Sequence, residues 1–283
     1  MIIDGKKFAQ NLRNKIKKEI QSIKKKTKLT PGLMVIVVGN HAPSEIYVRN
    51  KEISAKEVGI NSKVLRFKSS ISETKLISVI QKLNEDKRVN GILVQLPLPN
   101  QINGHKIIEE INPKKDVDGF HPINVGNLSS GKDALIPCTP LGCYLMIKSV
   151  RKNLAGLNVL IIGRSNLNGK PMAQLLLKED CTVTIGHSKT KNLKELCKKA
   201  DIVVVAVGRA NLVKGDWIKK GAIVIDVGIN RVENKKGYKI VGDVEFKSVV
   251  KRAKAITPVP GGVGPVTIAC LLNNTLKAFK NIN

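Results

Sequence analysis

Long hydrophobic runs are missing from this sequence of 283 residues. No apolar run approaches the roughly 20 residues that a membrane-spanning helix needs. The first five residues, Met1-Ile2-Ile3-Asp4-Gly5, also lack the basic-then-apolar layout of a signal peptide. We therefore expect a cytoplasmic protein with no membrane partner.

Cysteine and histidine are few, and neither follows a metal-binding pattern. The five cysteines are odd in number and form no CxxC motif, and the four histidines lack a spacing such as HExxH. These patterns suggest neither a disulfide framework nor a zinc site. We expect reduced, mostly buried thiols and no structural metal.

Acidic and aromatic residues are also scarce. Asp and Glu number 22 against 49 Lys and Arg, which gives a formal charge of +27 and raises nucleic acid as a partner. Aromatic residues, however, make up only 3%, too few for base-stacking platforms. We favour a solvated basic surface with no specific nucleic-acid partner, and the positive field would also suit an anionic substrate. The hydrophobic share of 42% predicts a folded chain. The length of 283 residues predicts one or two domains.

Helical and strand-like patterns alternate through the first half of the chain. Apolar residues at helical spacing predict a helix over 4–26, and two further helices are predicted over 43–58 and 72–84. Strands are predicted at 33–38, 60–67 and 91–97. This βαβαβ order indicates a parallel sheet covered by helices, and such sheets bind ligands beyond the carboxyl ends of their strands.

Tyr47 and Lys51 lie four residues apart on the second predicted helix, so they share one face with Ser44 one turn earlier. A phenol beside an ammonium group is a plausible proton-handling pair. In a chain so rich in lysine, the pair alone favours a solvated Lys beside a half-buried Tyr. Gln95 is a polar residue in a neighbouring apolar strand, so its amide must find a partner, and one alternative is that it caps a neighbouring loop. Its convergence with Lys51 at one sheet edge favours the functional interpretation.

Two carboxylates follow in Lys115-Asp116-Val117-Asp118-Gly119-Phe120. An Asp in such a loop can grip an amino-pyrimidine edge through paired, charge-assisted hydrogen bonds. The alternative is a structural Asx-turn. We favour the structural role for Asp116, and the pattern leaves both roles open for Asp118.

A second run of strand and helix patterns begins after Pro137-Cys138-Thr139-Pro140, where Thr139 is expected to cap a helix over 141–150. Strands are predicted at 158–162, 182–185, 202–207 and 223–227, with a helix over 172–177. This layout is typical of dinucleotide binding, although the turn after Gly163 departs from GxGxxG. The end of the second strand carries no acid, and Arg164 stands in the first turn, so the pattern favours the 2′-phosphate of NADP.

A loop rich in Pro and Gly, residues 257–267, precedes a last predicted helix over 268–279. Such a loop allows backbone to approach a flat ligand closely, and the alternative is a plain linker. Its length and its place between the nucleotide-binding half and a final helix favour the wall of a ligand cleft.

Together these motifs resemble the bifunctional methylenetetrahydrofolate dehydrogenase/methenyltetrahydrofolate cyclohydrolase family. The resemblance covers almost the whole chain, and its motifs are long and occur in the family's order. The matching stretches are residues 47–51, 91–99, 115–120, 163–165, 187–190, 226–230 and 258–265. The sequence departs from the family's pattern at Ala42-Pro43-Ser44, where the family usually reads Pro-Ala-Ser, and at Asn168, where it usually has an apolar residue.

The resemblance implies a role for each matched residue. Lys51 corresponds to the family's catalytic lysine, with Tyr47 and Gln95 beside it, and Asp118 corresponds to the residue that holds the pterin ring. The remaining matches are folate-contacting positions at Ser44, Pro260, Gly261 and Gly262, and NADP-contacting positions at Gly163, Arg164, Ser165, Ser188 and Ile229.

The resemblance also implies an α/β fold of two domains and a homodimer. Residues 1–138 would form the catalytic, folate-binding domain, to which 266–283 return as a final helix, and 139–265 would form a Rossmann-type NADP-binding domain. The implied reaction oxidises 5,10-methylenetetrahydrofolate with NADP+ and hydrolyses the product to 10-formyltetrahydrofolate. The alternatives are that only one activity is retained, or that the chain is a different two-domain NAD(P)-dependent dehydrogenase.

Overall fold

The computed structural model describes residues 1–40, 42–234 and 237–282, and it describes the backbone but not the side chains of 42–44 and 234. The chain divides into two compact units. We call Met1–Ala9 with Thr139–Thr267 the five-stranded unit, and Gln10–Cys138 with Ile268–Asn283 the three-stranded unit. Each unit therefore draws on two separate stretches of the chain.

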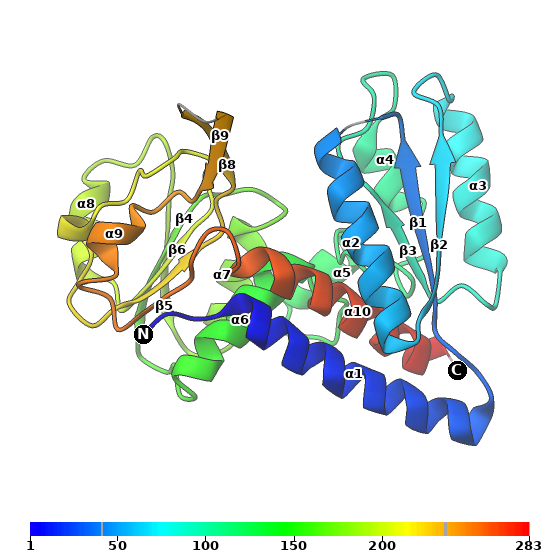
Figure 1. Cartoon of the computed structure of the whole chain (residues 1–283), viewed down its shortest axis with the longest axis horizontal. Coiled ribbons are helices and arrows are strands. Elements are labelled where there is room, and N and C mark those ends of the chain that lie inside the picture. Colours follow the sequence, from blue (N-terminus) through cyan, green and yellow to red (C-terminus); the bar gives the residue numbers. More distant parts are fainter. Residues whose placement is uncertain (41, 235–236, 283) are drawn as a thin grey trace. The chain divides into compact units, whose positions relative to one another are not determined.

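The three-stranded unit contains the predicted parallel sheet. Its strands β1 (Gly32–Val38), β2 (Asn61–Phe67) and β3 (Gly91–Val94) lie in the order β2-β1-β3, and both pairings are parallel (Figure 1). Helices α2 (Ala42–Val58) and α3 (Glu73–Glu85) make the two crossovers. The βαβαβ prediction is confirmed, although β3 ends at Val94 rather than at residue 97.

One face of this sheet packs against α3 and the short helix α4 (Gly104–Glu109). Ile36 and Ile92 on the strands share a buried cluster with Leu76 and Ile80 of α3 and with Ile107 of α4. The spacing of Leu76 and Ile80 places both side chains on one face of the helix. This packing fixes the strands whose carboxyl ends carry the residues of interest. Helix α5 (Pro122–Ser129) follows α4 in the chain.

The five-stranded unit contains a second parallel sheet, of β4 (Asn158–Ile162), β5 (Thr182–Gly186), β6 (Ile202–Val205), β7 (Ile223–Asp226) and β10 (Ala255–Ile256). Their order is β10-β7-β6-β4-β5. The order reverses on either side of β4, an arrangement that also occurs in dinucleotide-binding sheets. Met1–Ala9 belong to this unit because Ile2 bridges to Ile256, and the amide of Ile3 donates to the Ile256 carbonyl at 2.8 Å.

Helices α7 (Gly169–Leu177), α8 (Leu193–Lys199) and α9 (Phe246–Val249), with a short 3-10 turn at Gly215–Trp217, complete this unit together with α6 (Cys138–Val150). Helix α6 begins one residue before the predicted cap Thr139. Pro140 still lies in the first helical turn, where its missing N–H removes no helical hydrogen bond.

Two long helices and one hairpin remain. Helix α1 (Gly5–Thr27) is shifted by one residue from the predicted helix over 4–26, and α10 (Val263–Ile282) extends the predicted helix over 268–279 at both ends. An antiparallel hairpin joins β8 (Asn230–Asn234) to β9 (Gly237–Val241). Among the helices of the described residues, none is long and apolar enough to cross a membrane.

Candidate active site

Lys51 and Gln95 meet at the carboxyl edge of the three-stranded sheet. The Lys51 amine donates a hydrogen bond to Gln95 Oε1 at 2.9 Å, and Gln95 Nε2 donates to the Leu96 carbonyl at 2.8 Å. The amide of Gln95 is thereby held in one orientation, and it points its oxygen at the lysine. This contact confirms that the polar end of the strand finds its partner on helix α2.

The sheet topology explains why these two residues meet. Ile36 of β1 pairs with Val94 of β3 in parallel register, and the backbone amide of Gln95 donates to the Ile36 carbonyl at 2.9 Å. Helix α2 starts four residues after β1 ends, so Lys51 on its third turn lies beyond the same sheet edge.

Tyr47 lies one turn before Lys51 on α2, but the two heads share no hydrogen bond among those of the described residues; the amine pairs with Gln95 instead. The Tyr47 side chain is 37% exposed. Burial of the remainder raises the pKa of the phenol above its usual value of 10.0, so the hydroxyl is neutral near pH 7. It can therefore donate a hydrogen bond to a ligand.

Asp118 is half-buried beside this pair. Burial raises the pKa of its carboxyl to about 6, and the charge of Lys51 opposes that shift while the charge of Asp116 adds to it. The segment before Asp118 runs alongside β3, because Asp116 forms a parallel bridge with Ile92. The chain thus carries Asp118 towards the strand end where Gln95 lies. Lys51, Gln95 and Asp118 form one polar cluster.

Lys115 and Asp116 anchor the segment that carries Asp118. The buried amine of Lys115 donates to three carbonyls at the end of α3, those of Leu83, Asn84 and Asp86, at 2.7–3.1 Å. Buried Asp116 accepts hydrogen bonds from the backbone amide of His121 and the side chain of Asn124. Asp116 therefore has a structural role, as predicted, although its partners lie farther along the chain than in an Asx-turn.

Two residues that sequence patterns did not single out also hold this segment. The Cys138 thiol donates to the Val117 carbonyl at 3.3 Å and lies 3.9 Å from Asp118 Oδ1. Asn274, fully buried on α10, donates to the carbonyls of Val117 and Ile136 at 2.9 and 2.8 Å. All five cysteines are reduced and buried, as expected. One sequence signal could have identified Asn274: it is a polar residue in an otherwise apolar predicted helix, and a buried Asn needs hydrogen-bond partners.

The five-stranded unit contains a narrow glycine turn after β4. Gly163 has a φ of +129°, and a Cβ there would lie 2.4 Å from the Ala206 carbonyl oxygen. A Cβ on Gly169, the first residue of α7, would lie 2.0 Å from the Gly163 oxygen. Only glycine therefore fits either position, and the backbone between them forms a tight cradle at a helix N-terminus. Such a cradle suits a pyrophosphate group.

The exposed residues next to this cradle include a cationic side chain and two hydroxyl side chains. Arg164, Ser165 and Ser188 are all exposed, the first two in the turn after β4 and the third after β5. No carboxylate occurs in the described segment from Gly186 to Thr190. A cation with hydroxyls and no carboxylate fits the 2′-phosphate of NADP better than the free ribose hydroxyls of NAD. Ile229, after β7, is 54% exposed and offers an apolar contact.

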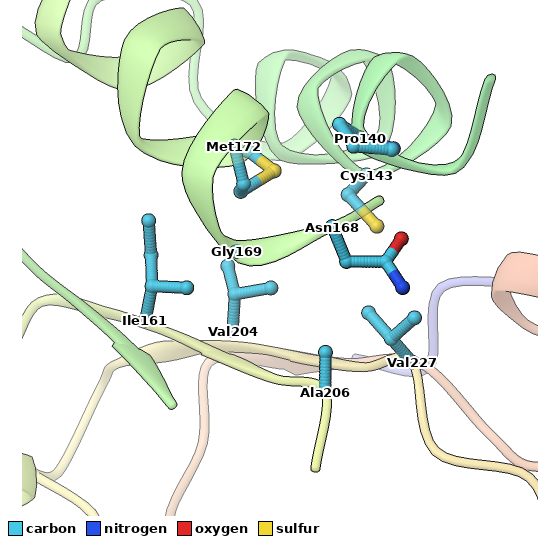
Figure 2. A pocket seen from close by; sticks show the side chains of 9 residues that line it. All are labelled: Pro140, Cys143, Ile161, Asn168, Gly169, Met172, Val204, Ala206 and Val227. Carbon is cyan, nitrogen blue, oxygen red and sulfur yellow. The ribbon is translucent and has the colours of Figure 1, made fainter. Parts of the chain in front are cut away.

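Figure 2 shows a small pocket within the same unit, between the ends of β4 and β6 and the helices α6 and α7. Most of its walls are apolar, and Asn168 contributes the amide. The Asn168 side chain lines this pocket and makes no capping hydrogen bond to α7. The nine residues that line the pocket are Pro140, Cys143, Ile161, Asn168, Gly169, Met172, Val204, Ala206 and Val227.

The other predicted substrate contacts are less fully described. The side chain of Ser44 and all of His41 lie outside the described residues. Pro260, Gly261 and Gly262 belong to the five-stranded unit, whereas Lys51, Gln95 and Asp118 belong to the three-stranded unit. Their contact with folate stays a prediction.

Comparisons with known proteins identify the family to which both parts of the chain are similar. Residues 3–118 match the catalytic domain of tetrahydrofolate dehydrogenase/cyclohydrolase, and residues 137–283 match the NAD(P)-binding domain of the same family. The bifunctional protein FolD of Pelagibacter ubique is 60% identical over 280 residues, which cover 99% of this chain and 98% of the relative.

Solved structures give the same result. The FolD dehydrogenase/cyclohydrolase of Campylobacter jejuni superimposes with a TM-score of 0.95 at 45% identity, over 99% of each chain. The enzyme of Trypanosoma brucei, solved with NADP and an inhibitor, has a TM-score of 0.95 at 38% identity, over 99% of this chain and 97% of its own. The chain therefore belongs to the tetrahydrofolate dehydrogenase/cyclohydrolase family.

Proposed function

We propose that this chain oxidises 5,10-methylenetetrahydrofolate to 5,10-methenyltetrahydrofolate with NADP+, and then hydrolyses the methenyl product to 10-formyltetrahydrofolate. Its membership of the bifunctional family supports both activities. The observation that carries the proposal is the hydrogen bond of 2.9 Å between Lys51 and Gln95 beside the Asp118 carboxyl. A proton-transferring amine and a group that can hold a pterin lie together at a ligand-binding edge of a parallel sheet.

Lys51 carries the proton transfers of the hydrolysis. Water attacks the methenyl carbon, one proton must leave the attacking water, and ring opening must deliver a proton to the departing nitrogen. The amine of Lys51 is the group that performs this exchange, and Gln95 fixes its position through Oε1. Tyr47, whose phenol stays neutral, donates a hydrogen bond to the substrate near the reacting carbon.

Asp118 holds the pterin ring through the paired N–H groups of its amino-pyrimidine edge. A carboxylate with two acceptor oxygens matches such an edge, and partial burial strengthens the hydrogen bonds. Ser44 is the further substrate contact that we assign on helix α2, and we also assign folate contacts to Pro260, Gly261 and Gly262.

Bound NADP+ supplies the hydride acceptor for the oxidation. Gly163 and the turn that follows it hold the pyrophosphate, because neither Gly163 nor Gly169 leaves room for a side chain. Arg164, Ser165 and Ser188 hold the 2′-phosphate, and Ile229 packs on the cofactor. The residues of the five-stranded unit need only position the cofactor, since the substrate nitrogen shares the positive charge that develops on the oxidised carbon.

The test is an absorbance assay with methylenetetrahydrofolate and NADP+, which follows NADPH and the methenyl product together. Lys51→Met should lower hydrolysis by about 10²–10⁴-fold and leave NADP binding unchanged. Lys56→Met is the matched control, because Lys56 lies on the same helix with its side chain 67% exposed. Equal cyclohydrolase rates in Lys51→Met and wild type would refute the role of Lys51. A wild-type chain that shows one signal without the other has retained one activity.

The finer organisation belongs to the same proposal. We assign folate binding to the three-stranded unit and NADP binding to the five-stranded unit, and we place the protein in the cytoplasm as a homodimer. Sedimentation of the purified chain tests the dimer: a single species with the mass of one 30.9 kDa chain would contradict it.

A further inference from the structure

Two buried carboxylates in the five-stranded unit have no part in the chemistry proposed above. Asp226, the last residue of β7, is 3% exposed, and Asp243, after the hairpin, is 0% exposed. Neither takes part in an ion pair among the described residues. Buried carboxylates are unfavourable unless hydrogen bonds compensate for lost hydration. We call the two side chains the carboxylate clasp.

Asp243 binds the loop that follows β6. Its Oδ2 accepts hydrogen bonds from the backbone amides of Val207 and Gly208 at 2.7 and 3.0 Å. Its Oδ1 accepts from the backbone amide of Arg209 at 2.8 Å and from the side chain of Asn230 at 2.8 Å. The Asp243 carboxylate thus accepts hydrogen bonds from three consecutive backbone amides in the loop after β6 and from one side chain that follows the loop after β7.

Asp226 binds the loop that follows its own strand and holds Asp243 in place. Its Oδ1 accepts from the amides of Gly228 and Asp243 at 3.0 and 2.9 Å, and its Oδ2 accepts from the amide of Val244 at 2.9 Å. The fit leaves no room for side chains nearby. A Cβ on Gly228 would lie 2.3 Å from the Asp243 carboxyl carbon, and one on Gly242 would lie 1.8 Å from Asp226 Oδ2.

The clasp lies at the carboxyl ends of the strands, where the loops of a dinucleotide-binding sheet contact their ligand. Val205 and Asp226 pair at the carboxyl ends of neighbouring parallel strands, and ligands bind beyond those ends. Ala206 and Val227, the next residues of the two strands, both line the pocket in Figure 2. The clasp therefore fixes the two loops that form one side of this pocket.

Ile229 is held on both sides by the clasp. The residue before it, Gly228, donates to Asp226, and the residue after it, Asn230, donates to Asp243. Its own side chain is 54% exposed, so packing within the described chain does not explain why it is held there. A rigid backbone that presents an exposed apolar side chain is a preorganised contact for a ligand.

We propose that Asp243 is a positioning residue for the dinucleotide cofactor: it holds the loops after β6 and β7 so that Ile229 and the pocket wall meet NADP in their bound geometry. This inference rests on the proposed function. Asp243 touches no ligand itself, and it acts through the backbone amides and through Asn230. Without it, binding would have to order both loops, and cofactor affinity would fall by that ordering free energy.

The test replaces Asp243 by Asn, which keeps the size of the side chain but turns one acceptor into a donor. The NH₂ group then faces N–H donors on one side of the clasp, and at least one buried amide loses its acceptor. We expect the Kd for NADP, measured by titration calorimetry, to rise by about tenfold or more. Hydrolysis of methenyltetrahydrofolate without NADP should stay within about twofold of wild type, and saturating NADP should restore most of the oxidation rate.

Asp201→Asn is the matched control. Asp201 belongs to the same unit and accepts a backbone hydrogen bond from Asn158 at 3.0 Å, but it precedes β6 and so lies at the opposite, amino end of that strand. Its replacement should leave the Kd for NADP unchanged. If both variants lose affinity equally, the effect is a general loss of stability, and the positioning role is wrong.

Asn230→Ala provides a second variant in case Asp243→Asn does not fold. It removes the side-chain hydrogen bond to Asp243 at 2.8 Å, together with a longer one to the Val241 carbonyl at 3.4 Å, and the Kd for NADP should rise severalfold. If Asp243→Asn folds and its Kd for NADP is unchanged, the inference is wrong. If Asp243→Asn does not fold, an unchanged Kd for NADP in Asn230→Ala overturns the inference. Failure of the wild-type chain to bind NADP would instead refute the proposed function, so the two failures are distinguishable.

Discussion

Replacement of Asp118 by Asn should stabilise the folded protein at neutral pH while it weakens folate binding. Burial raises the pKa of this carboxyl from an ordinary 3.8 to about 6 in the folded chain. A difference of about two pKa units corresponds to ~3 kcal/mol. The folded state therefore binds the proton more tightly than the unfolded state, and the contribution of this group to stability is full below pH ~4 and lost as the pH rises through about 6.

Asn at this position does not ionise, so the variant lacks this pH dependence. We would measure the free energy of unfolding by urea denaturation of both proteins from pH 4 to pH 8. Wild type should lose ~3 kcal/mol relative to Asp118→Asn across that range, most of it between pH 4 and 6. Two curves that stay parallel would refute the argument that burial of this carboxylate is unfavourable.

The same variant should bind a folate analogue about 10–100-fold more weakly at pH 7.5, because an amide offers one acceptor where the carboxylate offers two charged ones. Asp133→Asn is the matched control in the same unit, since the Asp133 side chain is 74% exposed and it should change neither measurement. An unchanged folate affinity in Asp118→Asn would remove the pterin-binding role. Stability and binding thus move in opposite directions, which a simple folding defect does not produce.

Two further predictions concern the cofactor and the anchor of the Asp118 segment. Arg164→Ala should lower the preference for NADP over NAD by about tenfold, because one charge-assisted contact to the 2′-phosphate is lost; an unaltered ratio of the two kcat/KM values would count against that contact. Lys115→Met should lower the free energy of unfolding by about 2–4 kcal/mol, since three carbonyls at the end of α3 lose a charged donor. Exposed Lys114→Met should leave the free energy of unfolding within about 0.5 kcal/mol of wild type, and an equal loss in both variants would contradict the anchor.

The parallel pairing of the predicted strands could be predicted because it depends on local patterns, whereas the strand order and the short strand β10 (Ala255–Ile256) were not predicted. Apolar strands that alternate with amphipathic helices leave parallel pairing as the arrangement that buries both faces. Parallel pairing in turn places all carboxyl ends at one edge, which predicts that Gln95 and Lys51 approach each other across 44 residues. The hydrogen bond between them follows from topology, whereas helix spacing alone places Tyr47 on the face of Lys51, and no hydrogen bond joins these two side chains among those of the described residues.

Contacts that depend on tertiary packing could not be predicted in this way. Cys138 meets Val117 across 21 residues, and Asn274 meets it across 157. No period or motif in the sequence links these positions. The carboxylate clasp is a similar case: Asp226 and Asp243 each precede or follow an apolar stretch, and only the folded chain shows that the intervening hairpin returns one to the other. The start of α6 shifted for a different reason, because Pro140 is compatible with any position in a first turn.

The place of Asn274 in the chain has a consequence for biosynthesis. Its side chain donates hydrogen bonds to the carbonyls of Val117 and Ile136, yet it is translated more than a hundred residues after either of them. While the ribosome is making residues 139–267, Asn274 has not yet been translated, so the Val117 and Ile136 carbonyls lack its hydrogen bonds. Completion of the segment that carries Asp118 thus waits for helix α10 to leave the exit tunnel, so a chain truncated before residue 268 would have the three-stranded sheet without the hydrogen bonds of Asn274 to this segment.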